Sequence, residues 1–145
     1  MDDRARGVCG GVGPLGAKYF SRRATPAQYA ALAAFQPQTI EILEARRAEF
    51  ARRRDYLLPA LRQLGFELPI TPEGAFYLYA GCGRFTQDSQ QFAAALLEQA
   101  GVAITPGLDF GDFESNTHVR FAYTTALDRL EEGVVRLADY LQRFA

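Results

Sequence analysis

Apolar positions recur regularly from Thr25 onward, and their spacing predicts two helices in succession. Thr25 suits a helix N-cap, and Pro26 suits the first helical position. A longer helix is expected from Pro37 to Leu64, because apolar residues recur there at helical spacings. They define one stripe that we expect to be buried, made of Ile40, Leu43, Phe50, Leu57, Leu58, Leu61 and Leu64.

Two residues mark the end of this long helix. Pro59 lies inside the apolar pattern and predicts a kink or a break near residue 58, because proline has no N–H and its ring clashes with the preceding turn. Gly65 follows the last apolar position and is typical of a residue that ends a helix with positive φ.

The rest of the chain is expected to interleave short strands with helices. A turn is predicted over 71–74, and Asp88 is expected to cap a helix that Gly101 ends. A capping box at 125–128 begins the last helix, whose apolar face carries Leu130, Val134, Leu137 and Leu141. The predicted strands are 66–68, 75–80, 102–105 and 118–123.

This order of elements predicts the fold class. It is an α/β chain of the α+β-like kind: a small, mostly antiparallel sheet with helices packed on one face, preceded by a long helix. Residues 1–24 are rich in glycine, have no apolar period, and are expected to form an irregular, flexible N-terminal segment. Residues 25–145 are expected to form one domain.

Composition narrows the function classes. The 145 residues are 48% apolar and 23% charged, with a formal net charge of −1, so neither nucleic acid nor an anionic membrane is expected as a partner. No apolar run is long enough to span a bilayer, and the first residues do not resemble a secretory signal. We expect a soluble cytoplasmic protein.

A cluster of arginines at 46–54 does not change this picture. Acidic residues interleave with it, which is typical of a solvated helix face with ion pairs within the helix. Cys9 and Cys82 are too few for a disulfide scaffold and have no partners for zinc, so no metal site is expected.

Arg120 is the residue with the most chemical potential. In a strand over 118–123 it shares a face with His118 and Ala122, opposite the larger apolar residues. A guanidinium there can present two parallel donors to a carboxylate. The strand position alone favours the other interpretation, a solvated arginine on an exposed face.

Three segments, in this order, resemble the carboxy-terminal part of a class I/II aminotransferase. They are 72–79 (PEGAFYLY), 100–111 (AGVAITPGLDFG) and 119–123 (VRFAY), and the resemblance runs from about Thr25 to the C-terminus. It implies that Arg120 binds the α-carboxylate of an amino or 2-oxo acid. It also implies that Phe76 matches an aromatic near the substrate, although the strand position itself favours an ordinary core aromatic.

The same resemblance implies that part of the active site is missing. These enzymes hold pyridoxal 5′-phosphate on a lysine in a Ser-Lys segment, which would fall before Met1 in this chain. Lys18, the one lysine present, has no such motif around it. We therefore expect no catalytic or cofactor-binding residues here and no cofactor bound to this chain alone.

Two function hypotheses follow. The first is a portion, by itself inactive, of an enzyme that transfers an amino group between an amino acid and a 2-oxo acid, with the homodimeric assembly usual in that family. The second is a non-catalytic module that binds a small carboxylate or a partner protein through the same sheet face.

Overall fold

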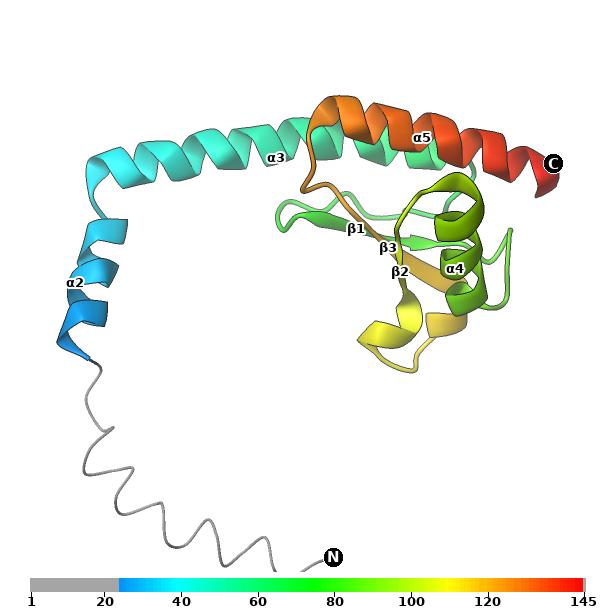
Figure 1. Cartoon of the computed structure of the whole chain (residues 1–145), viewed down its shortest axis with the longest axis horizontal. Coiled ribbons are helices and arrows are strands. Elements are labelled where there is room, and N and C mark those ends of the chain that lie inside the picture. The colour runs from blue at the N-terminus through cyan, green and yellow to red at the C-terminus, as the bar shows by residue number, and fades with distance from the viewer. Residues whose placement is uncertain (1–23, 145) are drawn as a thin grey trace, which may run out of the picture. The chain divides into compact units, whose positions relative to one another are not determined.

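The structure is a computed structural model that describes residues 24–144 (Figure 1). The segment 1–24, predicted to be irregular, thus lies outside the described residues except for Ala24, as do Cys9 and Lys18. The chain divides into two compact units after Ala45, and each is described by itself. Within 24–144, no helix combines the length and the apolar content that crossing a bilayer requires.

The first unit holds α2 (Thr25–Ala34) and the start of α3 (Pro37–Gln63). Thr25 is already helical, Ala24 occupies the N-cap position, and no side chain caps this helix. The predicted Thr25 cap is therefore wrong, because a capping residue must keep non-helical backbone angles. The Thr39 hydroxyl donates to the carbonyl of Ala33 at 2.9 Å and ties α3 to α2.

Helix α3 continues through Pro59, so of the kink or break predicted near residue 58 the break is wrong. Leu57, Leu58 and Leu61 are buried on either side of the proline. Burying each such side chain stabilises by about 1.5–3 kcal/mol, which together exceeds the roughly 3 kcal/mol that an internal proline costs. Tertiary packing therefore keeps the helix intact.

The end of α3 confirms the prediction for Gly65. Its φ is +97°, its N–H donates to Arg62 O, and the N–H of Phe66 donates to Leu61 O. This pair of bonds is the Schellman arrangement, in which a residue with positive φ satisfies the last carbonyls of the helix.

The predicted apolar stripe is buried only toward the end of α3. Leu57, Leu58 and Leu61 belong to the core, and Phe50 and Leu64 pack against it. Earlier in the helix, Ile40 is 42% exposed and Leu43 is 47% exposed. For these two residues the predicted burial is wrong, because periodicity shows which residues share a face but not what covers it.

The sheet has three strands, β1 (Tyr77–Gly81), β2 (Thr105–Pro106) and β3 (His118–Ala122), in the order β1-β3-β2. Both pairings are antiparallel, as expected. Residues 66–68 do not form the predicted strand: only Glu67 pairs, in a single bridge with Gly81. Strand β2 is shorter than the strand predicted over 102–105. The N–H of Val102 donates to the carbonyl of Leu96 in the preceding helix, so it is not available for strand pairing.

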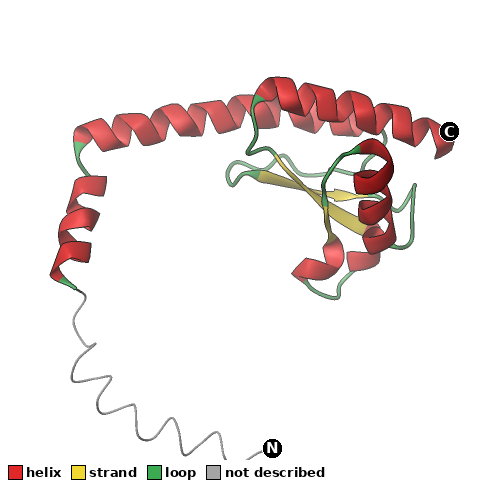
Figure 2. Ribbon diagram, in the orientation of Figure 1, coloured by secondary structure: helices red, strands yellow, loops and turns green. Residues whose placement is uncertain are grey.

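Helices α4 (Ser89–Ala100) and α5 (Leu127–Leu141) complete the second unit (Figure 2). The apolar face of the sheet packs with α3, α4 and α5 in one buried cluster, which confirms the predicted arrangement of helices over one face. The members of that cluster from the strands and these helices are Leu57, Leu58, Leu61, Leu78, Ala80, Phe92, Leu96, Val119, Phe121, Leu130, Leu137, Tyr140 and Leu141.

The predicted caps of these helices have different outcomes. The Asp88 carboxylate accepts from the N–H groups of Gln90 and Gln91 at 3.0 and 2.9 Å, and Gly101 ends α4 with φ +66°, both as expected. The capping box at 125–128 is wrong: Ala126 is the N-cap of α5 and no side chain caps it.

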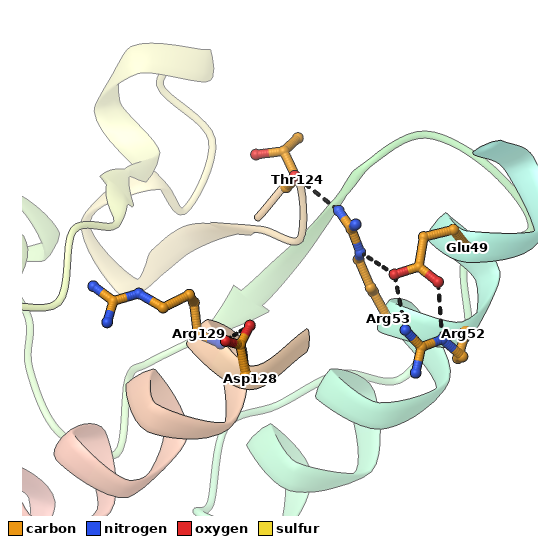
Figure 3. A network of polar contacts seen from close by, with 6 residues as sticks. All are labelled: Glu49, Arg52, Arg53, Thr124, Asp128 and Arg129. Atoms are coloured by element: carbon orange, nitrogen blue, oxygen red, sulfur yellow. Dashed lines mark hydrogen bonds and ion pairs between the residues drawn. The ribbon is translucent and has the colours of Figure 1, made fainter. Parts of the chain in front are cut away.

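The arginine cluster confirms the expected ion pairs. Glu49 pairs with Arg52 at 2.9 Å and with Arg53 at 2.8 Å, one turn along α3 (Figure 3). Hydrogen bonds from these two guanidinium groups lower the pKa of Glu49 to about 2.

Two arginines of this cluster do more than face solvent. The side chains of Arg53 and Arg54 are 16% and 19% exposed. Arg53 donates to the carbonyl of Thr124 at 2.8 Å, after the end of β3, and Arg54 donates to the carbonyl of Pro72 at 3.0 Å, before β1. For these two residues the expected solvated role is wrong, because both hold α3 against the segments that flank the sheet.

Candidate carboxylate site on the open sheet face

The alternation predicted for the strand at 118–123 is present in β3. Val119 and Phe121 are buried in the core, and Arg120 is half-buried on the opposite face, which the helices leave open. In the ladder Arg120 lies opposite Tyr79 of β1 and Thr105 of β2. The Arg120 side chain therefore extends from the central strand, between Tyr79 on one neighbouring strand and Thr105 on the other.

Three side chains hold the guanidinium of Arg120. Its Nη2 donates to Thr105 Oγ1 at 3.1 Å, and its Cζ lies 5.0 Å from the ring centre of Phe110 and 5.7 Å from that of Tyr77. No acidic side chain among residues 24–144 forms an ion pair with it. Its Nε is buried without a hydrogen-bond partner. The positive charge is thus oriented but not neutralised by the described residues.

Arg120 lines a surface depression of about 440 Å³. Among the lining residues it is the one cation, and Asp112 is the one anion. The walls are mainly aromatic, and the complete lining is Tyr77, Tyr79, Phe110, Gly111, Asp112, Phe113 and Arg120. A guanidinium at an aromatic wall is suited to a ligand with one carboxylate attached to an apolar or planar group.

A second cavity, of about 210 Å³, lies between α3, α5 and the segment after α4. It is lined by Arg129 and Arg136, but both of these pair with Glu132. Both guanidinium groups thus share one acidic partner, whereas Arg120 has none among residues 24–144, so Arg120 is the stronger candidate for binding an external carboxylate.

Phe76 lies next to this site but not on the guanidinium itself. It is 46% exposed, and its ring meets that of Tyr77 edge to face at 5.6 Å. Tyr77 in turn contacts Arg120, so the structure brings Phe76 and Arg120 into one aromatic cluster. The prediction that Phe76 contacts a substrate stays a prediction.

Tyr123 fixes the turn that carries Phe76. Ala75 has φ +64°, a conformation that costs energy for a residue with a Cβ. The buried Tyr123 hydroxyl lies 3.2 Å from Ala75 O and 3.3 Å from Gly74 O, and its own N–H donates to Phe76 O at 2.8 Å. Burial also raises the pKa of the Tyr123 phenol. The strained turn is thus held by the residue that follows β3.

The short 3-10 helix η1 (Gly107–Phe110) carries Phe110 to the site. A Cβ at Gly107 would lie 2.3 Å from the carbonyl oxygen of Ser115 and 2.7 Å from that of His118, so only glycine fits where η1 crosses the start of β3. Ser89 of α4 donates to the same Ser115 carbonyl at 2.8 Å. These contacts fix the loop from which Phe110 extends.

Sequence reasoning identified Arg120 but not the residues that orient it. Strand alternation places Tyr77 and Tyr79 on the face of Arg120, so this signal was available. Phe110 carries no such signal, because its position depends on how the loop after β2 folds back over the sheet. The structure thus adds Thr105, Tyr77 and Phe110 to the candidate site.

Comparison with known proteins decides the family. Residues 7–137 match the family described as aminotransferase class I and II. This chain belongs to that family. The resemblance noted in its strand motifs is thereby confirmed, and the enzymes of the family depend on pyridoxal phosphate.

Individual relatives agree. The chain is 36% identical over 114 residues to valine–pyruvate aminotransferase of Mycobacterium tuberculosis, covering 79% of this chain and 29% of that enzyme. It is 38% identical over 123 residues to an aspartate aminotransferase of Bacillus subtilis, covering 81% of this chain and 30% of that enzyme. A crystal structure of an aminotransferase from Mycobacterium tuberculosis matches 91% of this chain and 34% of its own, with TM-score 0.80 and 33% identity.

The aminotransferase chain described here therefore spans about a third of the length of these relatives. Covalent attachment of pyridoxal phosphate needs a lysine amine. Residues 24–144 contain no lysine, and Lys18 lies outside the described residues. The described residues thus do not fit covalent attachment of the cofactor, whereas the open face around Arg120 fits a carboxylate.

Proposed function

We propose that this chain supplies the substrate-carboxylate clamp of a pyridoxal-phosphate-dependent aminotransferase that moves an amino group between an amino acid and a 2-oxo acid. The observation that carries the proposal is Arg120. Its guanidinium is oriented by Thr105 and two aromatic rings, has no acidic partner among the described residues, and faces an open depression.

In this proposal Arg120 binds the α-carboxylate through parallel N–H donors, and Phe76 forms part of the wall beside the ligand. A bidentate, charge-assisted contact fixes both the position and the rotation of a carboxylate. The chemistry of amino transfer comes from the cofactor and its lysine, which we propose are supplied by a part of the enzyme other than residues 24–144. We further propose the homodimer usual in the family and a cytoplasmic location.

Binding of a small 2-oxo acid to the full chain tests the clamp. We expect pyruvate to shift the NMR signals of Arg120, Tyr77 and Phe110 in a saturable way. Methyl pyruvate, which has no carboxylate, is expected to leave them unchanged. Arg120→Lys removes the planar fork but keeps the charge, and we expect an affinity loss of about 2–3 kcal/mol.

Arg143→Lys is the matched control, since Arg143 contacts Tyr140 and Gln99 away from the sheet face. It is expected to bind pyruvate like the unmodified chain. Equal binding of pyruvate by the unmodified chain and by Arg120→Lys would contradict the clamp. The alternative of a non-catalytic carboxylate-binding module predicts the same binding, so binding tests the site and not the transfer reaction.

A further inference from the structure

The guanidinium of Arg120 has more contacts than the carboxylate role requires. One ring centre lies 5.0 Å from Cζ and a second lies 5.7 Å from it, and they come from different elements: Phe110 from η1 and Tyr77 from β1. A cation over the face of an aromatic ring is attracted by the ring's negative potential. Arg120 therefore receives two such contacts in addition to its hydrogen bond.

These contacts and the burial of Nε limit how a ligand can reach the guanidinium. Nε is buried, so its side of the group is closed to a ligand. One hydrogen of Nη2 is used by Thr105 at 3.1 Å. The remaining donors are those of Nη1 and the second hydrogen of Nη2. A carboxylate can then approach end-on, through the two terminal nitrogens.

We propose that Phe110 is a positioning residue that, together with Tyr77, holds Arg120 as this end-on fork. The inference rests on the proposed carboxylate clamp and adds how that clamp is oriented. Phe110 suits the role because its loop is itself fixed: Gly107 packs against the carbonyls of Ser115 and His118, and the Phe110 ring meets that of Tyr79 edge to face at 6.0 Å.

The loop also offers a matched control. Phe113 lies three residues further along, lines the same depression and is 88% exposed. Its ring makes no aromatic or cation–π contact with the residues that the structure describes. Phe110→Leu and Phe113→Leu are therefore the same chemical change at neighbouring positions, and only the first removes a ring from Arg120.

The test is NMR of the isotope-labelled full chain, with the Arg120 side-chain signals assigned by their loss in Arg120→Lys. A guanidinium held by contacts with two rings should show separate Nη1 and Nη2 signals and an Hε shifted by ring currents. In Phe110→Leu we expect the Nη signals to merge and pyruvate affinity to fall about two- to fivefold. Phe110→Tyr should restore both, and Phe113→Leu should leave the Arg120 signals as they are.

The two proposals fail in different ways. If the Nη signals are separate in the unmodified chain and merge in Phe110→Leu, but pyruvate does not bind, positioning holds and the carboxylate clamp is wrong. If pyruvate binds but the Arg120 signals and affinity are the same in Phe110→Leu, the clamp holds and positioning is wrong. If Phe110→Leu does not fold, the unmodified chain and Phe110→Tyr provide the test. Merged Nη signals in the unmodified chain would overturn positioning. Separate Nη signals in the unmodified chain, together with normal pyruvate binding by Phe110→Tyr, would support it.

Discussion

The two faces of the three-stranded sheet carry different kinds of side chain. On the covered face, Leu78 pairs with Phe121 and Ala80 with Val119, and all four are buried. On the open face the ladder places Tyr79 and Thr105 on either side of Arg120. Successive residues of a strand thus serve different faces. One set packs against the helices, and the alternate set carries the half-buried Arg120 and its neighbours.

Replacing one side chain on each face should show the largest difference. Phe121→Ala removes a buried ring that packs against Phe66, and we expect it to cost about 3–5 kcal/mol of unfolding free energy. Tyr77→Ala removes a ring that is 38% exposed and should cost under about 1.5 kcal/mol. Urea titration followed by circular dichroism measures both, and similar losses would mean that the open face also carries the fold.

Adding a methyl group at Gly107 tests the close contact between η1 and the carbonyls of Ser115 and His118. Gly107→Ala places a Cβ 2.3 Å from the Ser115 carbonyl oxygen, so backbone must move. We expect a loss of about 1–3 kcal/mol, with Phe110 displaced from Arg120.

Gly133→Ala in α5 is the matched control for that methyl group. A Cβ there meets nothing within 4 Å, and alanine favours the helix by about 0.5–1 kcal/mol. The two variants should therefore change stability in opposite directions. A neutral Gly107→Ala would show that η1 adapts without effect on the site.

The buried thiol of Cys82 should make the free energy of unfolding depend on pH. Cys82 is fully buried after β1, and burial raises its pKa from 9.0 to about 11. A raised folded-state pKa means that the unfolded chain loses the proton first. The stabilising contribution is complete below pH 9 and decreases as the pH rises toward 11, where about 2 kcal/mol of it has been lost.

Cys82→Ala isolates this term, because every other titrating group is the same in both chains. The stability difference between the unmodified chain and the variant should shrink as pH rises from 9 to 11. A difference that is constant over this range would mean that the thiolate forms as easily in the folded state.

Local sequence signals determined much of this molecule. The strand alternation that separates Arg120 from Val119 and Phe121, the cap at Asp88 and the helix-ending glycines Gly65 and Gly101 are all present as predicted. Each of these depends on a few neighbouring residues and on backbone geometry, so the chain encodes them locally. The order of its motifs also indicated the aminotransferase family.

Only the tertiary structure decided how those elements are used. It kept α3 whole through Pro59, left Ile40 exposed while burying Leu61, and directed Arg53 to a carbonyl beyond β3. It also brought Phe110 over Arg120 from a loop with no periodic signal. The physical reason is common to all four: burial and side-chain partners come from residues far away in sequence, and no local pattern records which of them will meet.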